Sequence, residues 1–178
     1  MIYLSKKFKK KLITEFSQSK KDFYVVKLSC GYFEKEKIDD TIDVMYTVWQ
    51  KIVQKECPLR KTIVSCVKKL CINYDDEKIL FFPYFYLVVV KKPEITDLDF
   101  VLKLRIYWQK LFIQNSGIKN FDDIKVEITQ TENIEEAVEF LSCVNIEKEK
   151  IIIEYHQIIS FLGIARQIRN EFVQSVER

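Results

Sequence analysis

Glycine, proline and histidine are scarce in this sequence. Its 178 residues include three glycines, three prolines and a single histidine, His156. So few glycines predict long helices and strands with few tight turns. Any His-based catalytic triad would have to use His156, and no spacing in the sequence recommends it. No glycine-rich phosphate loop is present either.

Closely spaced cysteine pairs are missing as well. The five cysteines form no Cys-x-x-Cys pair and lie mostly in apolar runs. They are Cys30, Cys57, Cys66, Cys71 and Cys143. Their odd number and their positions argue against a disulfide scaffold or a zinc ribbon and predict reduced thiols in the core. We therefore expect no metal site and no cofactor.

Long apolar runs are absent too. No window approaches the ~20 apolar residues of a membrane span, and the N-terminal lysines are not followed by a signal-peptide stretch. With 48% hydrophobic and 31% charged residues, the chain has the composition of one globular domain with a sizeable core. We expect a cytoplasmic protein that does not associate with membranes.

Positive charge is concentrated at the N-terminus, although the net charge is only +3. Seven lysines fall within the first 21 residues. Five of them belong to the segment SKKFKKKL: Lys6, Lys7, Lys9, Lys10 and Lys11. Residues 1–21 thus form a basic N-terminal arm, which is either a solvated, frayed terminus or a segment that contacts phosphates.

Hydrophobic periodicity predicts alternating strands and helices from residue 22 to residue 145. We expect strands at 22–30, 62–74, 79–90 and 124–129, and helices at 38–56, 96–113 and 131–144. Thr96 and Thr131 are the predicted N-terminal residues of the last two helices. This order indicates an α+β domain with helices on a central, mainly antiparallel sheet. Residues 146–178 have a helical pattern, broken at Gly163, and are expected to pack on the same domain.

The predicted hairpin resembles a known family. The segment VKKLCINYDDEKILFFPYFYLVVV is similar to the centre of the rolling-circle plasmid replication initiators, the Rep proteins of small Gram-positive plasmids. In that family a strand V-R-x-L-E-I-T-Y precedes a strand that reads aromatic-x-P-H-hydrophobe-H. The apolar and aromatic places are kept here by Val67, Leu70, Ile72 and Tyr74, and Pro83 falls on the family proline.

The flanking segments resemble the family in the same order, so the likeness spans about residues 22–172. DFYVVKLS is similar to the opening strand, YWQKLF to the tryptophan-bearing helix, and EAVEFLSC to the helix of the nucleophile. EYHQIISFLGIARQI is similar to the helical stretch that follows. The resemblance implies the fold of the HUH endonucleases, an RRM-like α+β sheet flanked by helices.

The resemblance also implies a DNA-nicking reaction, and this sequence lacks the groups that perform it. In the family two histidines and a glutamate hold a divalent metal, and a tyrosine attacks the scissile phosphate. The matching positions here hold Tyr84, Tyr86, Cys71 and, for the nucleophile, Phe140, or Glu139 if the register shifts by one residue. Phenols are poor ligands for Mg²⁺ or Mn²⁺, and phenylalanine cannot attack phosphorus. The resemblance therefore implies a degenerate, catalytically inactive member.

Tyr84 and Tyr86 have two interpretations. Their rings either fill the space of the lost imidazoles and metal, or present a stacking surface for unpaired bases. The second interpretation draws support from Lys68 and Lys69 on the neighbouring strand. Cys71 is interpreted as a small core residue rather than a new nucleophile or ligand.

We expect a DNA-binding or replication-regulating factor of a plasmid, phage or other mobile element. Its partner would be single-stranded or hairpin DNA, contacted by the N-terminal lysines and by Lys68 and Lys69. The alternative is a protein-interaction or structural module without DNA binding, in which LGIARQIRNEFVQSV contacts a partner or a second copy. A residual nicking activity through Tyr107 or Tyr155 is the least supported hypothesis.

Overall fold

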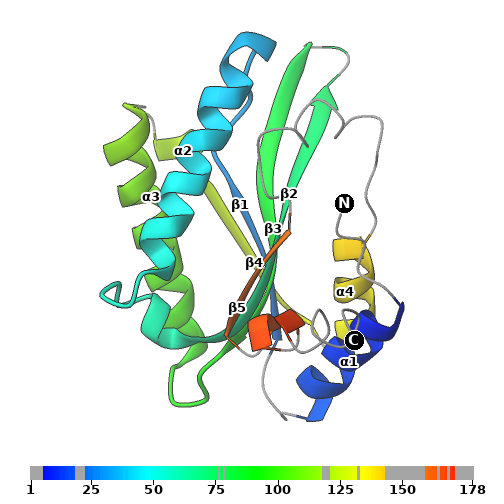
Figure 1. Cartoon of the computed structure of the whole chain (residues 1–178). Helices are drawn as coiled ribbons and strands as arrows, with labels where there is room; N and C mark the ends of the chain where they lie inside the picture. The colour runs from blue at the N-terminus through cyan, green and yellow to red at the C-terminus, as the bar shows by residue number, and fades with distance from the viewer. Residues whose placement is uncertain are drawn as a thin grey trace.

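The structure is a computed structural model that describes residues 6–18, 23–75, 77, 79–117, 121–131, 133–142, 159–163, 165–167 and 169–170. Its strands form one antiparallel sheet in the order β4-β1-β3-β2-β5 (Figure 1). The strands are β1 Phe23–Ser29, β2 Ile63–Asp75, β3 Leu80–Lys91, β4 Lys125–Thr131 and β5 Ile159–Gly163. The helices are α1 Lys6–Gln18, α2 Lys35–Val53, α3 Asp97–Ser116 and α4 Ile134–Ser142. The predicted α+β class is confirmed.

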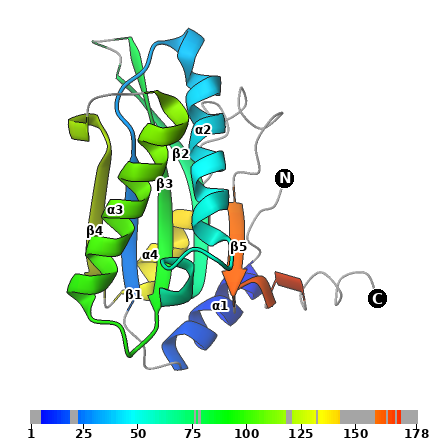
Figure 2. The ribbon, with the colours of Figure 1, turned by 90° about the vertical axis from the view of Figure 1, so that its left-hand side faces the viewer.

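From β1 to β4 the chain follows the order β-α-β-β-α-β. Strand β3 pairs antiparallel with both β1 and β2, and β1 pairs antiparallel with β4. Helix α2 therefore connects two parallel strands separated by β3, and α3 connects two parallel strands separated by β1. This split βαβ arrangement is ferredoxin-like. Figure 2 shows α2 and α3 side by side over one face of the sheet, with α4 behind it.

The α2/α3 face carries the larger hydrophobic core. Strand side chains alternate between the two faces, and β3 sends Phe85, Leu87 and Val89 toward these helices. Trp108 of α3 is fully buried beside Phe85, with 6.0 Å between the ring centroids. The Trp108 Nε1–H also donates a hydrogen bond to the Ser29 oxygen at 3.2 Å. Packing and a satisfied polar atom together hold α3 on the sheet.

The α1/α4 face carries a second core at one end of the sheet. Helix α1 buries one apolar stripe on the strands, formed by Phe8, Leu12 and Phe16. From β3, Val88 and Val90 belong to the same cluster. The sheet is thus covered by helices on both faces, but α1 and α4 are the shorter pair.

Pro83, which has no backbone N–H, lies at a gap in the hydrogen bonds between β1 and β3. Phe81 exchanges both backbone hydrogen bonds with Phe33 at 2.8 Å, so odd-numbered residues of β3 direct their backbone groups toward β1. The ladder between β1 and β3 ends at the pair Ser29–Tyr84. Pro83 falls between this pair and the Phe33–Phe81 bridge. A residue without an N–H is tolerated in this gap.

Two terminal predictions need correction. Residues expected to form a basic arm instead form α1, whose apolar stripe is buried in the second core. Residues 159–163, expected to be helical, form strand β5 at the edge of β2. Gly163 does end this segment, with φ of 62°, and a Cβ there would lie 1.9 Å from the Val64 oxygen.

Helix N-termini match the sequence analysis in one case and differ in the other. Thr96 precedes α3, and its side chain accepts a hydrogen bond from the Asp99 N–H at 3.2 Å, as expected. For α4 the predicted residue was Thr131, but the Asn133 side chain accepts the Glu136 N–H at 3.0 Å. Among the described residues no helix is both long enough and apolar enough to cross a membrane.

Candidate nucleic-acid interface

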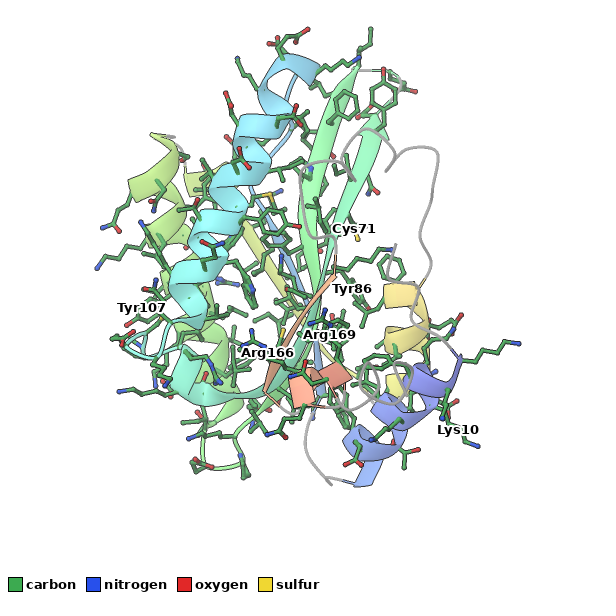
Figure 3. The ribbon with its side chains drawn as sticks, viewed as in Figure 1. Lys10, Cys71, Tyr86, Tyr107, Arg166 and Arg169 are labelled. Carbon is green, nitrogen blue, oxygen red and sulfur yellow. The ribbon has the colours of Figure 1, made fainter. Side chains whose placement is uncertain are left out.

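The four positions of the degenerate centre lie together on the α1/α4 face. We use this name for Cys71, Tyr84, Tyr86 and Phe140. Cys71 is directly opposite Tyr84 across the β2–β3 ladder. The ring of Phe140, on α4, lies 4.3 Å from the Tyr86 ring, centroid to centroid, with 41° between the planes. In Figure 3, Cys71 and Tyr86 lie along the sheet on the side that faces α4.

The chemistry of this centre is apolar and aromatic. Among the described residues no group of three or more His, Cys, Asp or Glu side chains is arranged to hold a metal. Burial, together with the charges of Cys71 and Glu136, raises the pKa of Tyr86 to about 12. At neutral pH this phenol therefore keeps its proton and is a poor metal ligand. Tyr84 is 8% exposed, which makes it a packed ring.

Lys68 and Lys69, two predicted DNA contacts, point to opposite faces of the sheet. Lys69 pairs with Tyr86 in the ladder, and its Nζ lies 5.4 Å from the centroid of the Phe140 ring. Lys68 points under α2, where its Nζ lies 4.0 Å from the Tyr46 centroid. Both side chains are buried, at 1% exposure for Lys68 and 3% for Lys69. Neither ammonium group is on the surface, where it would meet a DNA phosphate.

A row of aromatic rings continues from the degenerate centre toward the end of the β2–β3 hairpin. We call it the aromatic row. Phe82 lies 5.9 Å from Tyr84, and Tyr32, which follows β1, lies 4.8 Å from Phe82, between ring centroids. Tyr32 is 52% exposed and Phe82 is half-buried. The row comprises Tyr32, Phe82, Tyr84, Tyr86 and Phe140.

Lys27 of β1 places its ammonium group over this row. Its Nζ lies 5.1 Å from the Phe82 centroid and 4.9 Å from the Tyr84 centroid, within the range of a cation–π interaction. The same Nζ is 3.7 Å from a carboxylate oxygen of Glu127, on β4. The Lys27 side chain is 31% exposed, so its charge is accessible from solvent.

A hollow of about 410 Å³ opens beside Lys27 at this end of the sheet. Tyr32, Tyr74 and Phe82 line it, and Lys125 and Asn73 contribute polar groups. Glu127 and Asp75 supply acidic groups in the same wall. A hollow lined by aromatic residues, two lysines, two carboxylates and one amide fits an unstacked base better than a bare phosphate backbone.

The lysines of α1 divide between solvent and a neighbouring helix. Lys6, Lys7, Lys10 and Lys11 are exposed, and Figure 3 shows Lys10 pointing away from the sheet. Lys9 instead forms an ion pair with Glu139 of α4, at 2.7 Å between Nζ and the carboxylate oxygen. Helix α1 therefore presents a basic outer side, while Lys9 contributes to its attachment.

The other residues considered in the sequence analysis lie away from the degenerate centre or outside the described residues. Tyr107 is on α3, on the opposite side of the sheet from the degenerate centre (Figure 3). Tyr155, His156 and most of LGIARQIRNEFVQSV lie outside the described residues, as does Cys143. The described cysteines, Cys30, Cys57, Cys66 and Cys71, carry no disulfide.

No family model, no curated protein and no solved structure matches this chain. The resemblance to the Rep proteins thus rests on the residues quoted from the sequence.

Sequence reasoning missed Tyr32, Lys27 and Phe82. Phe82 and Lys27 could have been found, because strand alternation puts Phe82 on the face of Tyr84 and Lys27 on the face of Val25. Tyr32 lies after the strand, and no sequence pattern places its ring on Phe82.

Proposed function

We propose that this protein is a catalytically inactive relative of the rolling-circle replication initiators that binds single-stranded or hairpin DNA. It would act in the cytoplasm, on the DNA of a plasmid, phage or other mobile element, and regulate replication there. The observation that carries the proposal is the aromatic row with the Lys27 ammonium above it.

The row supports binding of unpaired bases because each base offers a flat face that stacks on an aromatic ring. Exposed Tyr32 and half-buried Phe82 are the accessible members. Stacking of one base on one ring contributes about 1–3 kcal/mol. Lys27 and Lys125 place ammonium groups beside these rings, next to Glu127 and Asp75, where a backbone phosphate following the base would meet a lysine.

The filled centre supports the inactive half of the proposal. Tyr86 and Phe140 are in ring contact where the family would hold a metal-bound histidine and a nucleophile. No described residue at these positions supplies an imidazole, a carboxylate ligand or a reactive hydroxyl. Loss of the metal ligands removes the Lewis acid that polarises the scissile phosphate.

A fluorescent single-stranded oligonucleotide tests binding by anisotropy at several salt concentrations. We expect Tyr32→Ala and Phe82→Ala each to weaken binding by about 1–3 kcal/mol. Lys27→Gln should lower the slope of log affinity against log salt by about 0.7. Ile106→Ala is the matched control, since Ile106 is 55% exposed on α3, on the other face. Absence of binding at low salt would overturn the proposal.

The α1 lysines are tested separately. The triple variant Lys6→Gln, Lys7→Gln and Lys10→Gln should weaken binding and flatten its salt dependence if α1 contacts the backbone. Lys55→Gln, Lys61→Gln and Lys110→Gln provide a control with the same change of charge at exposed sites outside α1 and β1 to β5. If both triple variants weaken binding equally, the effect comes from the net charge of the protein, and a specific contact of α1 with the backbone is contradicted.

Catalytic inactivity is tested with supercoiled plasmid and Mn²⁺. We expect no nicked product and no covalent protein–DNA adduct on a denaturing gel. A covalent adduct would contradict the proposal directly.

A second candidate function, protein interaction, is favoured by a different surface. Leu98, Leu102 and Ile106 recur every four residues along α3 and are 69%, 45% and 55% exposed. An exposed apolar stripe at helical spacing is typical of a surface that contacts another helix. If this surface carries the function, Leu102→Glu should abolish association with a partner and leave oligonucleotide binding unchanged.

A further inference from the structure

A groove between α2 and β5, on the opposite face from the aromatic row, has the size of a small-molecule site. Its volume is about 660 Å³, within the range of ligand pockets. Tyr46 and Trp49 of α2 form one wall, Leu162 and Ser160 of β5 form the other, and Lys68 of β2 also lines the groove. Lys68 and Ser160 are directly opposite each other in the β2–β5 ladder.

Lys68 is the unusual residue of this groove. Its side chain is 1% exposed, and its Nζ has no hydrogen-bond partner among the described residues. The Nζ lies 3.7 Å from the Phe85 ring centroid and 4.0 Å from the Tyr46 ring centroid. Two ring faces attract a cation, but they give its three N–H groups no lone pair to bond. A buried ammonium group of this kind lacks an acceptor.

The charges around the groove favour a negatively charged ligand. Arg166 lines the same groove, and its Nε donates to the Phe161 oxygen at 3.1 Å, which holds the guanidinium beside β5. Asp43 of α2 is the acidic residue of the lining. Tyr46 and Cys66 are neutral near pH 7, because burial raises the pKa of each, that of Cys66 to about 12. Two basic side chains thus face one carboxylate.

We propose that this groove binds a small organic anion, with a carboxylate or phosphate group accepting hydrogen bonds from Lys68 and an apolar body against Trp49 and Leu162. The flexible four-carbon stem of lysine lets the ammonium leave the two rings and meet an oxygen in the groove. Arg166 provides a second donor at the wall of the groove. The missing acceptor of Lys68 is then supplied by the ligand.

The protonation of Lys68 gives this site a pH dependence. Burial lowers the pKa of Lys68 to about 7. The anion binds the ammonium form, so its affinity levels off well below pH 7 and falls as pH rises through 7. Once most of the unliganded protein holds the neutral amine, the affinity falls toward tenfold per pH unit.

Calorimetric titration with benzoate and with phenyl phosphate tests the site, and benzyl alcohol serves as the neutral probe of similar shape. We expect benzoate or phenyl phosphate to bind and benzyl alcohol not to bind. Benzoate binding without phenyl phosphate binding indicates a carboxylate ligand, and the reverse indicates a phosphate. The pH series uses benzoate, because its charge is constant from pH 6 to 9.

Lys68→Met and Lys69→Met are the matched pair of variants, since they remove adjacent lysines that point to opposite faces. We expect Lys68→Met to weaken anion binding at least tenfold and to abolish its decline above pH 7. Lys69→Met should leave it unchanged, and Lys68→Arg should retain part of it. Unaltered binding in folded Lys68→Met, or no binding of either anion to the wild-type protein, would overturn the proposal.

The groove and the DNA surface are tested independently. Lys68→Met should leave oligonucleotide binding unchanged, because the aromatic row lies on the other face of the sheet. Failure of one proposal therefore leaves the other standing.

Discussion

The two faces of the sheet are built from the same strands but differ in how completely they exclude polar groups. On the α2/α3 face, large side chains such as Trp108 and Phe112 are fully buried. On the α1/α4 face, apolar packing occupies one end, and toward the hairpin it gives way to Lys27, Asn73 and half-buried Phe82. Because side chains alternate along each strand, neighbouring residues belong to different faces. Lys68 and Lys69, adjacent on β2, point to the α2/α3 face and to the α1/α4 face. The first face stabilises the fold and admits polar groups only around Lys68 and the groove beside β5, whereas the second is polar and accessible toward the hairpin.

The largest expected effect is on the α2/α3 face. Trp108→Ala removes a fully buried ring and its hydrogen bond to the Ser29 oxygen, and should lower the free energy of unfolding by about 3–5 kcal/mol. Leu102→Ala on the same helix is the control, because Leu102 is 45% exposed. Urea denaturation measures both. Similar losses for the two variants would contradict a core organised around Trp108.

Gly163 serves both faces, because β5 contributes Phe161 to one core and Leu162 to the other. Gly163→Ala places a Cβ 1.9 Å from the Val64 oxygen at a φ of 62°, so the backbone of β5 must shift. We expect a loss of about 2–3 kcal/mol and faster amide hydrogen exchange in β5. Gly117→Ala is the control, with φ of 70° but nothing near the added Cβ. If both variants lose the same free energy of unfolding, the loss in Gly163→Ala comes from the positive φ and not from the contact with Val64.

Much of the fold follows from sequence periodicity. The hairpin of β2 and β3 is predictable from its two apolar runs, and α3 from Thr96 and its apolar spacing. Helix α1 was not predicted, because the lysine cluster was interpreted as an arm. Phe8, Leu12 and Phe16 recur every four residues, and this apolar spacing is the pattern that predicts the helix. Strand β5 was missed because ISFLG is a short apolar run, which periodicity alone does not distinguish from a helix.

The candidate sites were less predictable than the fold. Alternation places Tyr84 and Tyr86 on one face, but no pattern tells which face α1 and α4 cover. Lys68 was expected at the surface because lysine is rarely buried. Its burial depends on the position of Tyr46 of α2 relative to Phe85, which is a matter of tertiary packing.

Lys68 provides the next test, because it is a polar residue on the apolar face. Lys68→Met removes an unpartnered buried ammonium and should raise the free energy of unfolding at pH 6 by about 1–2 kcal/mol, after the lost cation–π contacts are counted. Between pH 7 and 10.5 the unfolded wild type binds more protons than the folded form, because burial lowers the Lys68 pKa to about 7. Wild-type stability therefore rises there relative to the variant, by up to about 1.4 kcal/mol per pH unit. A variant less stable than wild type at pH 6 would show that the amine is structural.

The smallest expected effect concerns the degenerate centre on the other face. Tyr86 and Phe140 are in ring contact at 4.3 Å, yet Phe140 is 41% exposed, so each single alanine variant should cost less than Trp108→Ala. A double-mutant cycle on Tyr86→Ala and Phe140→Ala should give a coupling of about 0.5–1.5 kcal/mol in the free energy of unfolding. Tyr86→Ala with Ile106→Ala is the control pair, since Ile106 lies on α3 across the sheet, and should be additive. A coupling near zero for Tyr86 and Phe140 would mean that α4 does not close over Tyr86, and this part of the sheet would then be open to a ligand.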